Sequence, residues 1–415
     1  MSDKAKNLND ASLMLDGYME LDPRDQENFI AYYVDRYSPI DNLVREASQA
    51  KKHQRNFCWF FTGFTGAGKS TELNRIVSDT NLTKNYLPIR IDISEDLNVS
   101  NIEYTDIILV MAKACATLAE QIKCPISKDI RKHIFYWGKE IITENESQYL
   151  IETEGALGIS TPFFSLSDKV KTDEKKRQII RERIYNDVTR FISLLDDLTG
   201  ALMDYSQRQV LCILDGLDHV DYKPCLDLFN NYYATLIKPR LSKIFVIHVC
   251  MLHDQHFGAN IDRNRTLLPN IKVYAGENAN DLSKEGLRFY KDIISRYVDL
   301  NLFAENTLES LFEISAGIVR DMIRLTGIAC GYGAHAGGKK LTLDHVQRLW
   351  DEETARFRAL IESADYDLLK YLIDNPHPVG LNRFGALFHL KAVIFYPNGE
   401  GWYGLHPVVR RIINK

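Results

Sequence analysis

The sequence predicts an α/β fold built on a parallel sheet, and three observations lead to this prediction. Short apolar runs alternate with helix-compatible segments, which is typical of parallel sheets. The run at residues 57–62 is aromatic and apolar and leads into a glycine-rich turn, as a strand buried on both faces would. The run at residues 210–214 ends in the carboxylate of Asp215. Candidate functional residues therefore follow each of these two predicted strands: a glycine-rich turn after the first and a carboxylate after the second.

The composition is that of an ordinary globular chain. Of 415 residues, 45% are hydrophobic and 26% charged, which argues against wholesale disorder, collagen-like repeats and a coiled-coil rod. At roughly 100–200 residues per domain, the length fits two or three domains. Lys and Arg number 51 and Asp and Glu 56, a formal charge of −5. This balance gives no support for a chain-wide nucleic-acid or anionic-membrane surface.

The chain also lacks the signals of export or membrane insertion. No apolar run approaches the roughly 18–20 residues that span a bilayer, and the polar start has no signal-peptide core. The seven cysteines are scattered without a CxxC pair, which is typical of reduced core thiols. We therefore expect a cytosolic protein without membrane contacts.

The elements are predicted in order along the chain. Residues 1–50 resemble two or three helices, with starts near Asp22-Pro23 and Ser38-Pro39. The candidate strands are residues 57–62, 86–93, 209–214, 243–249 and 271–274. Between the second and third lies a helical insertion, with the best helical periodicity at 102–122 and 173–198 and an exposed loop at 155–164.

Helical patterns resume after the fifth candidate strand, at residues 283–297, 307–314, 318–330 and 343–362. The last fifty or so residues change character. Helices at 366–373 and 381–388 precede strands at 392–396 and 402–405, and Asn398-Gly399 between the strands is a strong hairpin signal. A final helix at 406–414 makes this series compatible with a winged-helix module.

The most specific motif is the segment at residues 63–70, GFTGAGKS, a complete GxxxxGK[ST] match between a predicted strand and a predicted helix. In such a loop the backbone N–H groups and the helix N-terminus face one anion. Lys69 would reach the β- and γ-phosphates, and the Ser70 hydroxyl would ligate Mg²⁺. The predicted phosphate-binding residues are Gly63, Thr65, Gly66, Ala67, Gly68, Lys69, Ser70 and Thr71. The motif predicts a nucleoside-triphosphate site.

The apolar run that ends in Asp215 supplies candidate carboxylates. A strand beside the phosphate loop would place Asp215 where it holds Mg²⁺ through water. Asp218 then lies near enough to orient or deprotonate an attacking water. The alternative for Asp218 is a cap on the following turn.

The phosphate loop, the strand ending in Asp215-Gly216-Leu217-Asp218 and the segment at residues 315–324, SAGIVRDMIR, together resemble the AAA+/STAND branch of P-loop ATPases, in particular bacterial members with a C-terminal winged helix. This resemblance spans roughly residues 40–415. It implies an ASCE-type sheet of order 5-1-4-3-2, bound ATP and Mg²⁺, a helical lid and ATP-driven oligomeric switching. The implied division is a helical segment at 1–50, an ATPase core at 51–280 with its insertion at about 100–205, a lid at 281–360 and a winged-helix-like module at 361–415.

The resemblance also implies roles for single residues. Arg320 matches the lid arginine that contacts the γ-phosphate, and Arg263 and Arg265 stand where related ATPases carry an arginine finger for the neighbouring subunit. His248 stands at the polar sensor position, where relatives have Asn, Thr or Ser, and a core histidine is the alternative. Gly216 replaces the usual Glu after the strand aspartate, which favours slow, switch-like hydrolysis over motor activity.

Other site classes fit less well. The Asn-Lys-x-Asp segment of GTPases and the Leu-Ser-Gly-Gly signature of ABC proteins are missing, and a small-molecule kinase remains a minor alternative. His248, His253 and His256 lack the spacing or the cysteine partners of a metal site.

The C-terminal module is poorly equipped to read DNA. Six basic and five acidic residues lie between positions 362 and 415, and the segment at 381–388 has one arginine, Arg383. Because phosphate contacts dominate DNA affinity, packing against protein is the favoured role and DNA contact the alternative.

The sequence as a whole predicts an ATPase switch that oligomerises and controls a separately encoded partner or effector, as related bacterial ATPases do in stress or antiphage modules. Two alternatives stay open: a DNA-associated initiator or loader that uses the winged helix, and a nucleotide-binding scaffold with little hydrolysis.

Overall fold

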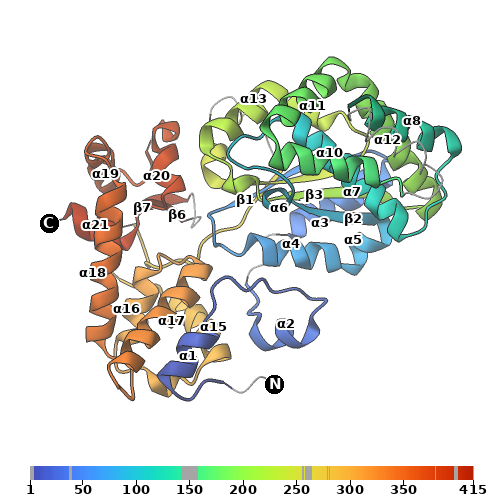
Figure 1. The fold of residues 1–415 in the computed structure, drawn as a ribbon. Coiled ribbons are helices and arrows are strands. Elements are labelled where there is room, and N and C mark those ends of the chain that lie inside the picture. The colour runs from blue at the N-terminus through green and yellow to red at the C-terminus, as the bar shows by residue number, and fades with distance from the viewer. Residues whose placement is uncertain are drawn as a thin grey trace.

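The computed structural model describes residues 4–36, 40–141, 158–254, 257, 264–277, 279, 281–378, 380–396 and 401–414. Figure 1 shows an α/β part that holds the sheet, a helical part that includes the N-terminal helix, and a smaller C-terminal group of helices with a hairpin. The C-terminal group lies beside both other parts, so segments far apart in the sequence meet around the end of the sheet.

The central sheet has five parallel strands in the order β2-β3-β4-β1-β5, which is the predicted order. The strands are β1 (Cys58–Gly63), β2 (Tyr86–Asp92), β3 (Gln209–Asp215), β4 (Ser242–His248) and β5 (Arg265–Leu267). Every residue of β3 and β4 is buried, as their continuous apolar sequences require. Because the strands are parallel, the last residues of β1, β3 and β4 all lie at the same end of the sheet.

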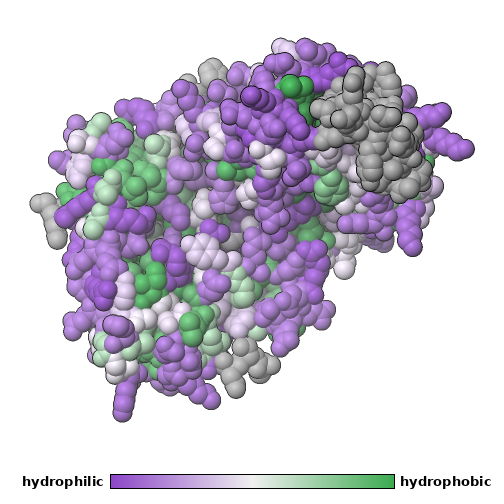
Figure 2. All heavy atoms as spheres, in the orientation of Figure 1, coloured by the Kyte–Doolittle hydropathy of each residue, from purple (hydrophilic) through white to green (hydrophobic). Residues whose placement is uncertain are grey.

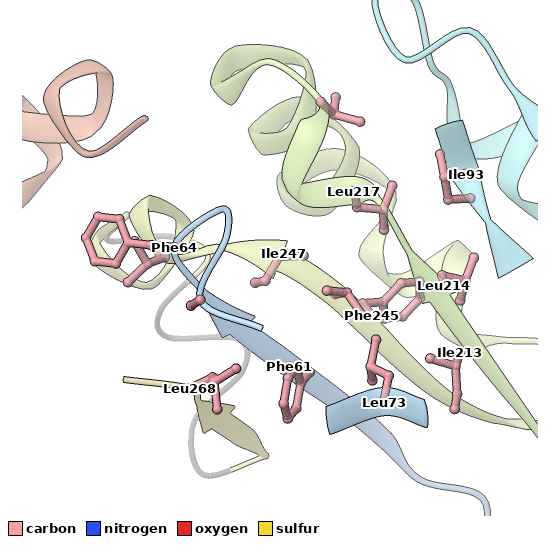
Figure 3. Close-up of a cluster of buried hydrophobic side chains, with 14 of the residues drawn as sticks. Phe61, Phe64, Leu73, Ile93, Ile213, Leu214, Leu217, Phe245, Ile247 and Leu268 are labelled. Carbon is pink, nitrogen blue, oxygen red and sulfur yellow. The ribbon is translucent and has the colours of Figure 1, made fainter. Parts of the chain in front are cut away.

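Helices cover both faces of this sheet (Figure 1). On one face lie α4 (Lys69–Ser78) and α5 (Thr80–Asn85), and on the other α7 (Tyr104–Gln121), α12 (Val188–Ser206) and α13 (Tyr222–Ile237). In Figure 3, Leu73 of α4 and Phe61, Ile213 and Phe245 of the strands point into one buried cluster. The helix that follows the glycine-rich loop is therefore anchored to the sheet by its apolar face.

The predicted insertion lies between β2 and β3 and is helical. It comprises α6 (Ile93–Asp96), α7, α8 (Lys128–Ile141), α10 (Thr161–Thr172), α11 (Glu174–Asn186) and α12. Two predictions here are wrong in detail. The helix expected at 173–198 is two helices that break at Asp187, and the loop expected at 155–164 becomes helical from Thr161, while residues 155–157 lie outside the described part.

The fifth strand was also predicted in the wrong place. Strand β5 is Arg265–Leu267, and the apolar run at 271–274 pairs elsewhere. Ile271 N–H donates to the carbonyl of Gly317, and Tyr274 forms an isolated bridge with Leu282. These residues are apolar because they pack under the helical part, and not because they enter the sheet.

The helical part contains α15 (Lys284–Tyr297), α16 (Thr307–Ile314), α17 (Val319–His335) and α18 (Leu343–Leu360), close to the predicted ranges. The N-terminal helices are α1 (Leu8–Met14), α2 (Gln26–Tyr32) and α3 (Asp41–Lys52). Helix α1 packs along α17, and α2 packs on α15. The N-terminal chain is therefore docked on this part of the molecule before it returns to the sheet.

The C-terminal group has the predicted order of elements. It consists of α19 (Asp365–Asp374), the 3₁₀ turn η4 (Leu381–Phe384), α20 (Gly385–His389), the antiparallel strands β6 (Val393–Tyr396) and β7 (Trp402–Leu405), and α21 (Pro407–Ile413). The hairpin forms as predicted, while residues 397–400 at its turn lie outside the described part. Helix α20 packs against α13 and against η2 (Val249–His253), directly after β4.

The surface in Figure 2 is largely hydrophilic, with a green apolar patch over α19 and α20. Among the described residues, no helix is long and apolar enough to cross a membrane. All seven cysteines are unpaired, and six of them are buried.

Candidate functional site

The glycine-rich loop connects the end of β1 to the start of α4. Gly63 is the last residue of β1, and Lys69 is the first residue of α4, so residues 64–68 make the turn between them. Gly66 has a φ of +88°, and a Cβ at this position would lie 2.9 Å from the Cβ of Arg320. A side chain at position 66 would therefore be strained and would push the loop away from α17.

Lys69 is buried at the centre of this loop. Its Nζ lies 2.9 Å from the carbonyl oxygens of Gly63 and Phe64 and 2.9 Å from Oδ2 of Asp218. The side chains of Lys69 and Asp218 are each 5% exposed. Since an ammonium has three N–H donors, all of them are used, and an incoming anion would have to replace at least one of these acceptors.

Asp218 lies on the 3₁₀ turn η1 (Leu217–His219), which begins after Gly216. Burial, the largest single influence, raises the pKa of the Asp218 carboxyl, but the charge and hydrogen bond of Lys69, together with His219 and His248, outweigh burial, so the pKa lies below its usual value. Asp218 is therefore an ionised carboxylate beside the phosphate loop, held there by a charged hydrogen bond.

Asp215 ends β3, and its carboxylate is already occupied by protein donors. Oδ2 accepts from Arg90 Nη2 at 2.6 Å and from Arg90 Nε at 3.1 Å, and Oδ1 accepts from the N–H of Gly216 at 2.9 Å. Burial raises the pKa of Asp215 even though the guanidinium of Arg90 acts in the opposite direction. Arg90 also donates to Oδ1 of Asn74 on α4 at 2.9 Å and to Oε2 of Glu20 at 3.1 Å.

Arg320 brings α17 to the loop. Its backbone N–H donates to the carbonyl of Gly66 at 2.9 Å, and its guanidinium lies over the ring of Tyr18, 5.4 Å from the centroid. The predicted lid arginine therefore lies at the phosphate loop and is covered by an aromatic residue from the N-terminal chain.

His248 ends β4 directly beside Gly63 in the sheet register. Its Nδ1 accepts from the N–H of Cys250 at 3.2 Å, while Nε2 is buried with no hydrogen-bond partner among the described residues. Burial, with the charge of Lys69 adding to it, lowers the pKa of His248 to about 3. A neutral imidazole with a free nitrogen close to Lys69 and Asp218 is compatible with the sensor position that the resemblance implied.

Two of the remaining sequence candidates, Arg265 and His253, lie near Tyr403 of β7. Arg265 is exposed on the edge strand β5. Burial lowers the pKa of His253 and the charge of Arg265 adds to this effect, whereas burial raises the pKa of Tyr403 and the charge of Arg265 opposes it. Arg263 and His256 lie outside the described residues. His253 contacts the hydroxyl of Tyr403 at 3.3 Å, and within the described part of the chain no three potential ligands gather into a metal site.

Two small cavities adjoin at the loop. The first, of about 100 Å³, is polar on the loop side, which is formed by Thr65, Gly66, Gly68, Lys69, Ser70 and Thr71. Asp218 and Arg320 also line it, and residues 17–21 of the N-terminal chain close it. The second cavity, of about 70 Å³, is lined mainly by aromatic and aliphatic side chains, including Tyr32, Tyr33, Val34 and Phe289. Ligand pockets usually measure roughly 300–1,000 Å³, so this conformation is a closed one.

Three site residues were missed by the sequence analysis. Arg36 donates from Nη2 to the carbonyl of Ala67 in the loop at 2.6 Å, Arg90 donates to Asp215, and Glu20 accepts from Arg90. Arg90 had a readable signal, since a charged residue within a predicted buried strand needs a partner. Arg36 and Glu20 had none, because their positions depend on where the N-terminal chain crosses the core.

No protein-family model and no curated protein matches this sequence. Among solved structures, the chain is similar to a Walker-type ATPase of Pyrococcus abyssi, with 14% sequence identity, 91% of this chain and 96% of that chain covered, and a TM-score of 0.42. It is also similar to the ORC1 protein of Aeropyrum pernix in complex with DNA (12% identity, 92% and 93% covered, TM-score 0.40). A third is the RuvB Holliday junction branch migration motor of Thermotoga maritima (11%, 90% and 94%, TM-score 0.34). At these identities and TM-scores the likeness concerns the fold alone; the sheet order and the loop after β1 give this chain the α/β fold of P-loop NTPases.

Proposed function

We propose that this chain is a cytosolic, ATP-binding switch ATPase of the AAA+/STAND type, which hydrolyses ATP slowly, assembles into oligomers and controls a separate partner protein. The observation that carries the proposal is the meeting of Lys69, Asp218 and the loop carbonyls within hydrogen-bond distance at the end of the sheet. A buried lysine paired with an acidic residue from another strand end is placed to exchange that partner for phosphate.

The residues fit a magnesium nucleotide in their chemistry. The start of α4 and the loop amides supply positive potential for phosphates, and Lys69 supplies a point charge. Ser70 lines the same cavity as Lys69, and Asp215 adds a carboxylate at the end of β3, which β4 separates from β1. Hydroxyl and carboxylate oxygens are the ligands that Mg²⁺ takes beside nucleotide phosphates, where the ion neutralises charge.

The two adjoining cavities fit the two ends of a nucleotide. The polar cavity at the loop suits phosphates, and the aromatic cavity beside it suits a base. Both are lined by Gly68, Thr71 and Val319, so one ligand could extend through both once residues 17–21 move.

Two features at the end of β3 favour slow hydrolysis: no acidic residue directly follows Asp215, and the carboxylate of Asp218 is paired with Lys69. Gly216 occupies the position after Asp215, so the nearest carboxylate for orienting water is Asp218. Asp218 is bound to Lys69, and it becomes free to act on water only when Lys69 turns to phosphate.

Nucleotide binding and hydrolysis are tested separately. Lys69→Ala should abolish ATP binding in isothermal titration, while Lys84→Ala, a change of an exposed lysine on α5, should leave binding unchanged. Asp218→Asn should retain binding and reduce phosphate release by about a hundredfold, the usual effect of removing a general base. Full-strength ATP binding by a folded Lys69→Ala variant would refute the nucleotide site.

The surface supports a protein partner better than DNA. In α20, Gly385, Leu387 and Phe388 are buried, and the helix packs on α13 and η2. A helix buried against the core cannot enter a DNA groove in the same conformation. Lys391 is paired with Asp321 at 3.1 Å, and the apolar patch over α19 and α20 faces outward (Figure 2). Exposed apolar patches of this kind favour contacts with another protein.

A further inference from the structure

The N-terminal chain crosses the phosphate loop as a strap, which we define as residues 16–22. On one side the strap touches α17, since a Cβ at Gly17 would lie 2.7 Å from the carbonyl of Arg320. On the other side it touches α4, since Nδ2 of Asn74 donates to the carbonyl of Leu21 at 3.2 Å. The strap therefore bridges the helical part and the sheet, above the cavity that Lys69 and Ser70 line.

One ion-pair chain connects the strap to the end of β3. Arg90 Nη2 contacts both Oε2 of Glu20 at 3.1 Å and Oδ2 of Asp215 at 2.6 Å. The side chain of Asp215 is 7% exposed, that of Arg90 20% and that of Glu20 48%. The ion pair between Arg90 and Asp215 is therefore largely shielded from water, whereas the ion pair between Arg90 and Glu20 is open to solvent on the side of Glu20.

A buried carboxylate needs one cationic partner, and here Arg90 is that partner. The guanidinium approaches a single oxygen, Oδ2, with two nitrogens, and it also bonds Asn74, one helical turn after Ser70. The guanidinium thus lies between Asp215 and the face of α4 that presents Ser70. A divalent cation held by Ser70 and Asp215 would compete with Arg90 for the same carboxylate, because two cations at one site repel.

We propose that Arg90 is a positioning residue that occupies Asp215 in place of a divalent cation and links that site to the strap through Glu20. Binding of a magnesium nucleotide displaces Arg90 from Asp215, and the contact between Arg90 and Glu20 then no longer holds the strap over the cavity. The inference rests on the proposed nucleotide site and adds a residue and a segment to it.

Competition between Arg90 and the metal can be distinguished from a permanent supporting role of Arg90, because the two predict opposite effects of removing Arg90. If Arg90 only oriented Asp215 for the metal, its removal would weaken the contribution of magnesium to nucleotide binding. If Arg90 competes with the metal, its removal strengthens that contribution. The measured quantity is the ratio of the ADP dissociation constant in EDTA to that in excess Mg²⁺, by isothermal titration.

We expect Arg90→Gln to raise this ratio by about tenfold, the effect of one hydrogen bond to a charged group. Glu20→Gln should leave the ratio unchanged, because Arg90 stays on Asp215 and only the link to the strap is lost. Arg240→Gln removes an arginine that is 83% exposed and far along the chain from the site, and it should leave the ratio unchanged.

Hydrogen exchange gives a readout that does not depend on affinity. In the wild-type protein, Mg²⁺ with ADP should speed exchange of the strap amides, and Glu20→Gln should speed it without ligand. An unchanged or lowered ratio in Arg90→Gln overturns the inference; should that variant not fold, unaltered strap exchange in Glu20→Gln overturns it. A wild-type protein that binds no ADP refutes the proposed site itself, and with it the inference.

Discussion

Burial is the main cause of the low pKa values of three histidines, His248 and His406, which are buried, and His253, which is partly buried. Burial lowers the pKa of His248 and His406 to about 3 and that of His253 to about 4. Asp321 faces His406 and acts in the opposite direction, but burial outweighs it. Each of these imidazoles must therefore stay neutral in the folded protein.

This burial predicts how stability depends on pH. In the unfolded chain a histidine has a pKa of about 6.5, so below this pH the unfolded chain binds protons that the folded chain does not. The free energy of unfolding therefore falls as the pH drops from about 6.5 toward the pKa values of the folded protein. Between pH 7.5 and pH 5, each of these histidines should lower the free energy of unfolding by about 2 kcal/mol. His406→Asn removes one of these sites and retains an acceptor for the N–H of Val408 at the start of α21. Urea unfolding at both pH values should show a loss about 2 kcal/mol smaller in this variant than in the wild type; an equal loss would contradict the assignment.

Arg320 allows a test of γ-phosphate recognition at the level of one side chain. Its backbone is fixed by Gly66, so removal of the side chain should leave the loop in place. Arg320→Ala should change ADP affinity by less than about twofold and weaken binding of a non-hydrolysable ATP analogue by about tenfold, since one charged contact is lost. Arg358→Ala, on the exposed end of α18, is the matched control for titration. Equal weakening of both ligands would exclude a γ-phosphate role.

At the scale of elements, the turn between α16 and α17 packs against the segment that follows β5. Gly317 there has a φ of +75°, and a Cβ would lie 1.8 Å from the carbonyl of Ile271. Gly317→Ala should therefore destabilise the fold by about 3 kcal/mol or more. Gly200 lies inside α12, where an added Cβ would meet no atom within 4 Å, and Gly200→Ala should stabilise by about 0.5–1 kcal/mol. Urea unfolding of the two variants should shift in opposite directions.

The same scale shows what the sequence could and could not predict. Strands β1, β3 and β4 were predictable because they are buried on both faces and therefore have continuous apolar runs at their centres. Strand β5 was not, because it has only three residues and includes the exposed Arg265, whereas the more apolar run at 271–274 is buried under the helical part. Apolar sequence reports burial, and burial alone does not distinguish a sheet partner from a helical cover.

Some residues of the candidate site could likewise be predicted from the sequence, and others could not. The loop at 63–70 and Asp215 were found because their chemistry is local, with spacing fixed by one turn and one strand end. Glu20 and Arg36 act through contacts more than thirty residues away in sequence, and no spacing rule connects them to the loop. Their place depends on the path of the N-terminal chain across the core.

At the scale of the whole molecule, the phosphate loop is in contact with the C-terminal group. The ring centroid of Phe64, within the loop, lies 6.4 Å from that of Phe388 on α20 and 6.0 Å from that of His248. In Figure 3, Phe64 lies beyond the strand ends, away from the cluster around Phe61 and Leu73. If the loop rearranges on binding phosphate, as the proposed function implies, Phe64 would press on α20, and we therefore expect nucleotide binding to affect the C-terminal group.

The proposed oligomerisation makes a quantitative prediction about Arg265. This side chain is exposed on an edge strand, where a neighbouring subunit in a ring could receive it. A subunit with Lys69→Ala retains its arginine but has no nucleotide site, and a subunit with Arg265→Ala retains its site but offers no arginine. Each variant alone should be inactive. In an equal mixture assembled from separated subunits, about one interface in four pairs an intact site with an intact arginine, as random cyclic assembly requires. Phosphate release should then recover to about a quarter of the wild-type rate, and Lys69→Ala mixed with Lys69→Ala/Arg265→Ala is the inactive control. A mixture no more active than its components would remove Arg265 from the neighbour's site.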